Sequence, residues 1–249
     1  MTNNTPQARI CAIIPTYNNA ATILQEVEHV RAYCPDIIVV NDGSTDNTQQ
    51  LLEELSRDVT VVTFAKNRGK GSALVAGFRK AKELAFTHAI TIDADGQHFA
   101  DDIPAFVKAL EEQQQRGIVV GARNLTEKNM PRENTFANRF SNFWFSLQTG
   151  LRLPDTQSGF RLYTLEDLCG LSLITSRYEA ELELLVYAAW AGKRIVSIPV
   201  KVYYPPEEER VSHFRPVYDF TRISILNTFL CLAAIVYGYP RMMFRKLLK

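Results

Sequence analysis

The sequence lacks an excess of charge of either sign. Its 249 residues include 28 lysines and arginines against 27 aspartates and glutamates, for a formal net charge of +1. Such a chain has no general electrostatic attraction for nucleic acid, so we expect no nucleic acid among its partners. Hydrophobic residues make up 46% of the chain, enough for the core of one large domain.

Cysteine is scarce, and Cys11, Cys34, Cys169 and Cys231 lie far apart. No pair has the close spacing of a zinc site. Because Cys11 and Cys231 lie in apolar stretches, we expect buried thiols in a reducing compartment. Residues 1–9 are polar and lack the apolar run of a signal peptide. These features together predict a cytoplasmic location.

The glycine-rich phosphate loops of common nucleotide-binding folds are also missing. Gly69 and Gly71 have no third glycine at position 74, and the P-loop spacing around Lys70 is absent. The turn after the first predicted strand, at 15–18, contains no glycine. A Rossmann dinucleotide site, a P-loop site and a pyrophosphorylase are therefore unsupported.

The sequence does contain an alternation of short apolar runs with helical patterns. The apolar runs predict strands at 9–14, 37–40, 59–64, 89–92, 117–121 and 195–202. Helical spacing predicts helices over 23–30, 48–56, 73–81, 102–115, 136–149 and 184–190. This order predicts an α/β fold with a mostly parallel sheet flanked by helices. Polar motifs follow the strands, so they should meet at one edge of the sheet.

Asp93 and Asp95 directly follow the apolar run at 89–92. On a strand, side chains at i and i+2 project to the same side, and two carboxylates that close repel each other unless a cation joins them. Mg²⁺ and Mn²⁺ prefer oxygen ligands and often share them with phosphates. The pair therefore predicts a divalent cation site, and the alternative is a polar turn. His98 is either a third metal contact, or a residue behind the metal ligands or at the surface.

Five polar motifs occur along the chain, at 14–18 (IPTYN), 40–46 (VNDGSTD), 67–71 (NRGKG), 93–98 (DADGQH) and 158–161 (SGFR). Together they resemble family 2 glycosyltransferases of the GT-A fold, which is Rossmann-like. The resemblance is nearest to the branch of dolichol-phosphate mannose synthases and polyprenyl-phosphate glycosyltransferases. It implies an enzyme whose donor is a nucleotide-diphosphate sugar, with UDP and GDP both open.

The resemblance also implies roles for individual residues. Thr16, Tyr17 and Asp42 would hold the base and ribose, with Pro15 in the same motif. Asp93 would face the ribose or the sugar, beside Ala94. Asp95 would bind Mg²⁺ or Mn²⁺, and Gln97 would complete the metal shell. Lys70 and Arg123 would neutralise phosphate charge. One departure is Asn41, because the family often has two acids at this point, and here Asp42 stands alone.

Sugar transfer from a diphosphate requires stabilisation of the leaving group, which a divalent cation supplies as a Lewis acid. In-line attack would invert the anomeric configuration. A lipid phosphate acceptor is already ionised near neutral pH, with a second pKa of about 6, so it needs no general base. A hydroxyl acceptor needs a carboxylate within reach.

Asp155 is our candidate for that base, and the alternative is a turn residue after Pro154. Arg161 is the third candidate catalytic residue, beside Asp93, and the alternative is a structural salt bridge. Glu181 and Glu183 cannot share a helix face, so at most one of them points at the site. The aromatic residues of 136–149 are expected to be mostly core.

The C-terminal part carries an uncharged stretch at 223–240, with basic residues on both sides. We expect a GT-A domain at 1–205 and a C-terminal helical segment at 206–249 that docks on a membrane surface. The alternatives are a helix packed on the sheet or a contact in a homo-oligomer. Arg210 to His213 are similar, without a clean match, to an Arg and Ser loop of related enzymes.

The leading hypothesis is an inverting, metal-dependent glycosyltransferase that acts on a lipid-linked acceptor, with polyprenyl phosphate as the expected one. It would be peripheral at the inner face of the cell membrane. One alternative is transfer to a hydroxyl of a glycolipid or another small acceptor. A second alternative is a nucleotide-sugar-binding protein without turnover.

Overall fold

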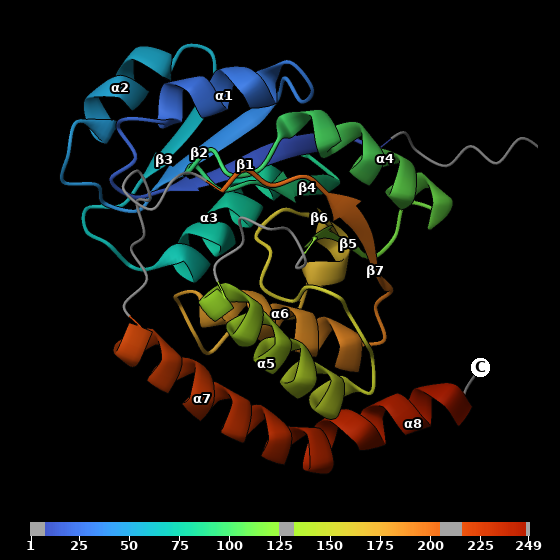
Figure 1. Ribbon diagram of the computed structural model, residues 1–249. Helices are drawn as coiled ribbons and strands as arrows, with labels where there is room; N and C mark the ends of the chain where they lie inside the picture. Colours follow the sequence, from blue (N-terminus) through green and yellow to red (C-terminus); the bar gives the residue numbers. More distant parts are fainter. Residues whose placement is uncertain (1–7, 125–131, 205–215, 248–249) are drawn as a thin grey trace, which may run out of the picture.

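The computed structural model describes residues 8–124, 132–204 and 216–247, and places one sheet between two layers of helices (Figure 1). The strands are β1 (Ile10–Thr16), β2 (Ile37–Asn41), β3 (Thr60–Thr63), β4 (His88–Thr91), β5 (Ile118–Arg123), β6 (Arg161–Thr164) and β7 (Ile195–Val200). The α-helices are α1 (Ile23–Arg31), α2 (Thr48–Leu55), α3 (Lys70–Glu83), α4 (Ile103–Glu112), α5 (Arg132–Thr149), α6 (Glu179–Trp190), α7 (Pro216–Ala233) and α8 (Tyr239–Leu247).

The strand order in the sheet is β3-β2-β1-β4-β6-β5-β7. β1 to β4 pair in parallel, and so do β5 and β7, whereas β6 runs antiparallel to both of its neighbours. The predicted α/β fold with a mostly parallel sheet is confirmed. Strand β6 was missed in the sequence, because it is only four residues long and begins with an arginine.

The core lies on both faces of the sheet, as alternate residues of β1 demonstrate. Ala12 and Ile14 pack on the side covered by α1, α2 and α4, whereas Cys11 and Ile13 pack on the side of α3, α5 and α6. Cys11 is buried, as predicted, whereas Cys231 is only partly buried.

Helix α3 lies unusually close to its neighbours because of two glycines. A Cβ on Gly71 would lie 2.3 Å from the Cβ of Ala180 in α6, and a Cβ on Gly77 would lie 2.6 Å from Ile13. Any larger residue at these positions would push α3 outward. The first residue of α3 is Lys70, so this packing fixes where the Lys70 ammonium can reach.

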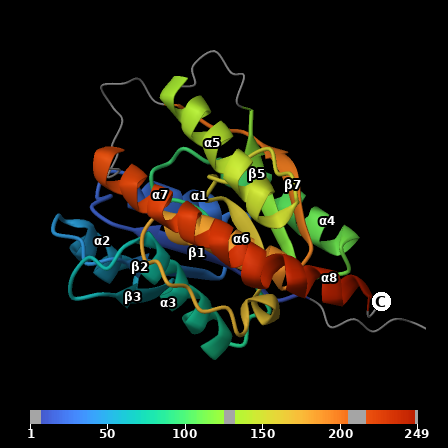
Figure 2. The ribbon, with the colours of Figure 1, turned by 90° about the horizontal axis from the view of Figure 1, so that it is seen from below.

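Helices α7 and α8 run across the base of the domain, beneath α5 and α6 (Figure 2). One face of α7 is packed, with Leu226 and Leu230 buried. Arg222 pairs with Glu179 of α6 at 2.5 Å, and the Gln148 side chain donates to Asn227 at 2.9 Å. The predicted helical C-terminal segment is therefore present, and its junction at 205/206 lies outside the described residues, as do Arg210 to His213.

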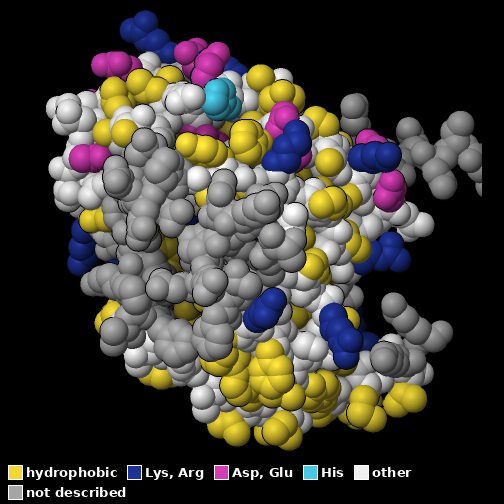
Figure 3. All heavy atoms as spheres, in the orientation of Figure 1, with side chains coloured by type: hydrophobic (Ala, Val, Ile, Leu, Met, Phe, Trp, Pro, Cys, Tyr) yellow, Lys and Arg dark blue, Asp and Glu magenta, His cyan; other side chains and the backbone are white. Residues whose placement is uncertain are grey.

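The other face of this segment is apolar and exposed, and it forms a continuous hydrophobic area at the base of the molecule (Figure 3). We call this area the basal apolar face. Its members in α7, α8 and the π-helical turn between them are Ile225, Phe229, Leu232, Ile235, Val236, Tyr237, Met243, Phe244 and Leu247. Residues Thr221–Arg245 are long and apolar enough to cross a membrane, by length and composition alone.

The aromatic residues of α5 are less buried than predicted. Phe145 is fully buried, but Phe143 is 60% exposed, and Phe140 and Trp144 are partly buried. The expectation that this stripe is mostly core is wrong for Phe140, Phe143 and Trp144, because the described residues leave their side of α5 partly open.

Candidate active site

The polar motifs meet at the carboxyl edge of the sheet, as predicted. The Asp42 amide donates to the Thr16 carbonyl at 2.8 Å, which joins the ends of β1 and β2. The Asn18 amide donates to Ser44 Oγ at 3.0 Å. The Thr22 hydroxyl donates to the Ala94 carbonyl at 2.6 Å, which ties the start of α1 to the turn after β4. The motifs at 14–18, 40–46 and 93–98 thus form one continuous rim.

Asp42 is buried, and its carboxylate accepts hydrogen bonds from the backbone amides of Arg68 at 2.7 Å and Gly69 at 2.8 Å. Burial raises the pKa of Asp42 above its usual value, although these two amides act in the opposite direction. Asp42 therefore holds the loop before α3 in place. Its predicted role toward the base and ribose, shared with Pro15, Thr16 and Tyr17, stays a prediction.

Asn41 occupies the position where related enzymes often carry an acid. Its amide nitrogen donates to Gln49 Oε1 at 2.7 Å, and its oxygen accepts from the Ser44 amide at 3.0 Å. A carboxylate could not donate the first of these bonds. Asn41 thus joins the end of β2 to α2 and to the turn between them.

Lys70 lies between two carboxylates. Its ammonium is 2.7 Å from Asp93 Oδ1 and 2.9 Å from Glu181 Oε2. Burial disfavours the charged form of Asp93, but the Lys70 ammonium outweighs it, and the pKa of Asp93 lies below its usual value. Glu183 points elsewhere and accepts bonds from the amides of Ile174 and Thr175. The prediction that at most one of the two glutamates faces the site is confirmed.

This arrangement explains two features of the sequence. Helix α6 begins at Glu179, five residues before the predicted apolar helix. The helix can begin with charged residues because Glu179 pairs with Arg222 and Glu181 pairs with Lys70. A Cβ on Gly159 would lie 2.6 Å from Asp93 Oδ2 and 2.7 Å from Lys70 Nζ. Glycine in the motif at 158–161 therefore leaves room for the Lys70–Asp93 pair.

Asp95 lies in a turn that follows β4, since the strand ends at Thr91 and Gly96 has a φ of +71°. Both aspartates follow the strand, as expected, so the alternation of side chains along a strand does not apply to them, but they still lie close together. The Gln97 amide donates to Asp95 Oδ1 at 3.0 Å. Burial and the Asp93 charge raise the pKa of Asp95 to about 6. Asp95 therefore caps a turn, and its carboxylate is repelled by that of Asp93, while the cation site stays a prediction.

Glu26 of α1 was not identified from the sequence. It is 3% exposed, and burial, together with the charges of Asp95 and Asp93, raises the pKa of Glu26 to about 7. The sequence signal was weak, because a glutamate on an amphipathic helix is normally exposed.

The donor set fits a hard divalent cation. Asp95 brings a carboxylate to the turn beside Asp93, whose own carboxylate is paired with Lys70, and the charge of Glu26 lies behind them. Within residues 8–124, 132–204 and 216–247, no group of three His, Cys, Asp or Glu side chains can enclose a metal ion. Such a partial oxygen shell suits Mg²⁺ or Mn²⁺ completed by substrate phosphates.

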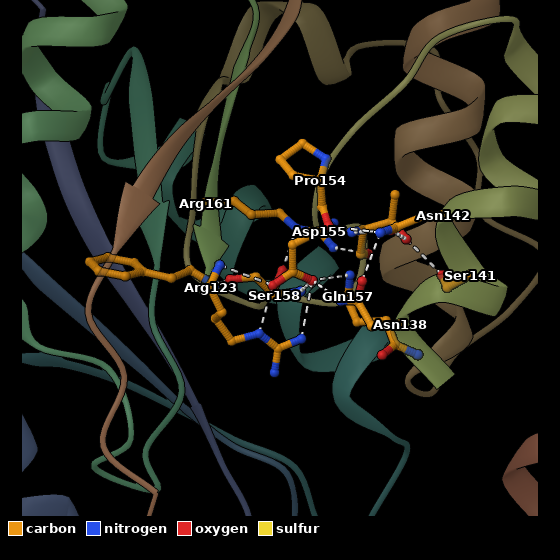
Figure 4. Close-up of polar contacts among 11 residues, drawn as sticks. Arg123, Asn138, Ser141, Asn142, Pro154, Asp155, Gln157, Ser158 and Arg161 are labelled. Atoms are coloured by element: carbon orange, nitrogen blue, oxygen red, sulfur yellow. Dashed lines mark hydrogen bonds and ion pairs between the residues drawn. The ribbon is translucent and has the colours of Figure 1, made fainter. Parts of the chain in front are cut away.

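Asp155 is fully buried and saturated with hydrogen bonds (Figure 4). It accepts six, three of them from Arg123, with Nε at 2.6 Å from Oδ2. The others come from the Asn138 side chain and the amides of Gln157 and Ser158. Burial opposes ionisation, but the Arg123 guanidinium outweighs it and lowers the pKa of Asp155. Asp155 therefore fixes the loop at 155–160 and the Arg123 side chain.

Arg161 is also fully buried. Its guanidinium donates to the carbonyls of Ser158 at 2.7 Å, Thr156 at 2.9 Å and Glu181 at 2.8 Å. It has three backbone acceptors and no carboxylate at salt-bridge distance in the described ranges. Arg161 thus holds the 155–160 loop against α6, from beneath the site.

His98 is buried, and its ring lies 5.3 Å from the Phe160 ring. Burial lowers the pKa of His98 to about 4, so the ring is neutral at physiological pH. Its Nδ1 atom has no hydrogen-bond partner among the described residues. Burial excludes a surface histidine, and neutral imidazole is compatible with a metal contact or with a place behind the metal ligands.

Comparison with known proteins identifies a family and several relatives for this chain. The model of glycosyl transferase family 2 matches residues 11–168, more than half of the chain. The UDP-N-acetylglucosamine–dolichyl-phosphate N-acetylglucosaminyltransferase of Methanococcus voltae is 34% identical over 216 residues, which cover 78% of this chain and 86% of the relative. The undecaprenyl-phosphate mannosyltransferase of Micrococcus luteus is 29% identical, over 77% of this chain and 82% of the relative.

Among solved structures, the mannosyltransferase PcManGT from Pyrobaculum calidifontis, in complex with GDP-Man and Mn²⁺, has a TM-score of 0.57 at 19% identity. The match covers 94% of this chain and 74% of that one. At this identity the likeness establishes the fold, and the predicted GT-A architecture is confirmed.

Proposed function

The chain belongs to glycosyl transferase family 2, and we propose that it transfers a sugar, with inversion, from a nucleotide-diphosphate sugar to polyprenyl phosphate or a similar lipid-linked phosphate. The observation that carries the proposal is the Asp93–Asp95 turn at the carboxyl edge of a GT-A sheet. Two relatives are named for dolichyl-phosphate and undecaprenyl-phosphate acceptors.

The donor would lie along the rim formed by β1, β2 and the turn after β4. Pro15, Thr16, Tyr17 and Asp42 would contact the base and ribose, and Asp93 with Ala94 the ribose or sugar. One relative is named for a UDP-sugar, and one structural neighbour holds GDP-Man, so either nucleotide suits the family.

Asp95, together with Gln97, would hold Mg²⁺ or Mn²⁺, which supplies charge stabilisation for the departing diphosphate. Lys70 would hold Asp93 in position beside the donor, since its ammonium already bridges Asp93 and Glu181. Arg123 would play the corresponding role through its bond to Asp155. The positive charges of Lys70 and Arg123 would then be held near the donor phosphates by their carboxylate partners.

The state of Asp155 favours a phosphate acceptor over a hydroxyl acceptor. A general base needs a free lone pair directed at the acceptor, but Asp155 accepts six hydrogen bonds and its pKa is lowered. A phosphate nucleophile is already ionised and needs only to be positioned. Asp155 would then act by fixing Arg123.

The acceptor would reach the site from a membrane on which the basal apolar face rests. Arg241 and Arg245 of α8 are exposed beside this face, and they would favour an anionic surface. One side of α7 is packed on α5 and α6, which supports a helix that lies along the domain at the membrane surface. An inner-face, peripheral location follows from a nucleotide-sugar donor.

The test uses purified protein with Mn²⁺, UDP- or GDP-sugars, and either a short polyprenyl phosphate or the matching polyprenol, with products identified by mass spectrometry. The proposal predicts a sugar–phosphate–lipid product and none from the alcohol. A product from the alcohol alone would favour the hydroxyl-acceptor alternative. Tight donor binding without any product would favour the non-catalytic alternative.

A further inference from the structure

Glu26 lies on the face of α1 that packs behind the Asp93–Asp95 turn. Thr22, one helical turn earlier, donates its hydroxyl hydrogen bond to the Ala94 carbonyl, which fastens this face to the turn. An ideal Cβ on Gly96 would lie 3.9 Å from Glu26 Oε2. The carboxylate is therefore directed at the same turn that carries the candidate metal ligands.

This carboxylate is buried and lacks compensation. It is 3% exposed, and its Oε1 atom has no hydrogen-bond partner in the part of the chain that the structure describes. The charges that act on it most strongly are those of Asp95 and Asp93, which are of the same sign. Buried carboxylates are normally paired, because burial of an uncompensated charge is costly. An apolar residue would fill this position on α1 at lower cost, beside the buried Val27 and Val30.

A cation at the turn would supply the missing compensation. We propose that Glu26 is a positioning residue for the divalent cation. Its carboxylate places a further negative charge behind Asp95, and this charge strengthens the binding of the cation to Asp95. The inference rests on the metal-dependent function proposed above. Groups behind the direct ligands commonly change metal affinity by about 10-fold to 100-fold.

The test measures Mn²⁺ binding to the whole chain. Electron paramagnetic resonance reports the concentration of free Mn²⁺ as MnCl₂ is added to the protein, first without nucleotide and then with UDP or GDP. Glu26→Gln has nearly the same shape, and it mimics a protonated glutamate, so it removes only the charge. We expect its dissociation constant for Mn²⁺ to rise about tenfold. Glu26→Asp, which keeps the charge, should recover part of the affinity.

Glu28→Gln is the matched control, because Glu28 is exposed on the same helix, and its Mn²⁺ affinity should equal that of the wild type. In transfer assays, Glu26→Gln should need more Mn²⁺ for half-maximal rate, with a kcat at saturating Mn²⁺ within about twofold of wild type, since the effect is on binding.

Equal Mn²⁺ affinity of Glu26→Gln and the wild type, with both folded by circular dichroism, would overturn the inference and leave the proposed function intact. Tighter binding by the variant would overturn it as well. A wild-type protein that binds no Mn²⁺ with either nucleotide would overturn both this inference and the metal dependence of the proposed function.

Discussion

Removal of the Glu26 charge should stabilise the protein when no metal is present. The pKa of Glu26 is raised from 4.5 to about 7, so the folded state holds a proton that the unfolded state has already lost between these values. Stability from this group is fully present below pH 4.5 and is lost as the pH rises through 7. At about 1.4 kcal/mol per pH unit, the difference amounts to at most about 3 kcal/mol.

The perturbation is Glu26→Gln, which cannot ionise. In EDTA at pH 8, its free energy of unfolding should exceed that of the wild type by about 1 to 3 kcal/mol, because a buried uncompensated charge has been removed. In a chain of this size the melting temperature should then rise by roughly 2 to 12 °C. At pH 4.5 and below, the two proteins should unfold at the same temperature.

The assay is thermal or urea unfolding followed by circular dichroism from pH 4.5 to 8, with Glu28→Gln as the control for a change at the surface of the same helix. Burial and the Asp93 charge, which raise the pKa of Asp95, are the same in all three proteins, so only the difference between curves is interpreted. A variant that is destabilised at pH 8, or one whose curve runs parallel to that of the wild type at every pH, would refute the reasoning.

Three further predictions follow from the site and the C-terminal helices. Asp95→Ala should lower the transfer rate by at least about a hundredfold while circular dichroism stays unchanged, since the carboxylate serves the cation; near-normal turnover would exclude Asp95 as the metal ligand. Gly159→Ala should weaken donor binding severalfold in calorimetry, because the added methyl group must displace the Lys70–Asp93 pair, and an unchanged affinity would show that this pair does not shape the donor site. Val236→Glu, on the basal apolar face, should reduce co-sedimentation with vesicles that contain anionic phospholipid, and its melting temperature should stay within about 2 °C of the wild-type value. Equal co-sedimentation of variant and wild type would argue against docking through this face.

Much of the fold could be predicted from the sequence, because the buried parallel strands are apolar runs separated by helical patterns. Residues 37–40 illustrate this, with four β-branched residues that are all buried in β2. Strand β6 could not be found in this way. Its antiparallel pairing depends on neighbours that are distant in the chain, and its first residue, Arg161, is buried only because three carbonyls accept its hydrogen bonds.

The residues that meet at the candidate site could also be predicted from the sequence, but not their partners. The motifs, together with Asp155 just before the last of them, predict that Asp93, Lys70 and Asp155 lie at one edge, and the structure brings them there. Which cation binds which carboxylate depends on how α3 and α6 approach each other, and this cannot be read from spacing. Glu26 was missed for a related reason, because the burial of a helix face depends on what packs against it.

The central claim is that the chain transfers sugar to a lipid phosphate. The most direct test is the rate of Mn²⁺-dependent release of nucleotide diphosphate from a panel of UDP- and GDP-sugars, measured with and without short-chain polyprenyl phosphate. The account predicts that one donor is used and that its release rises with the concentration of the lipid phosphate. Release that does not change when the lipid phosphate is added, or no release with any donor, would contradict it.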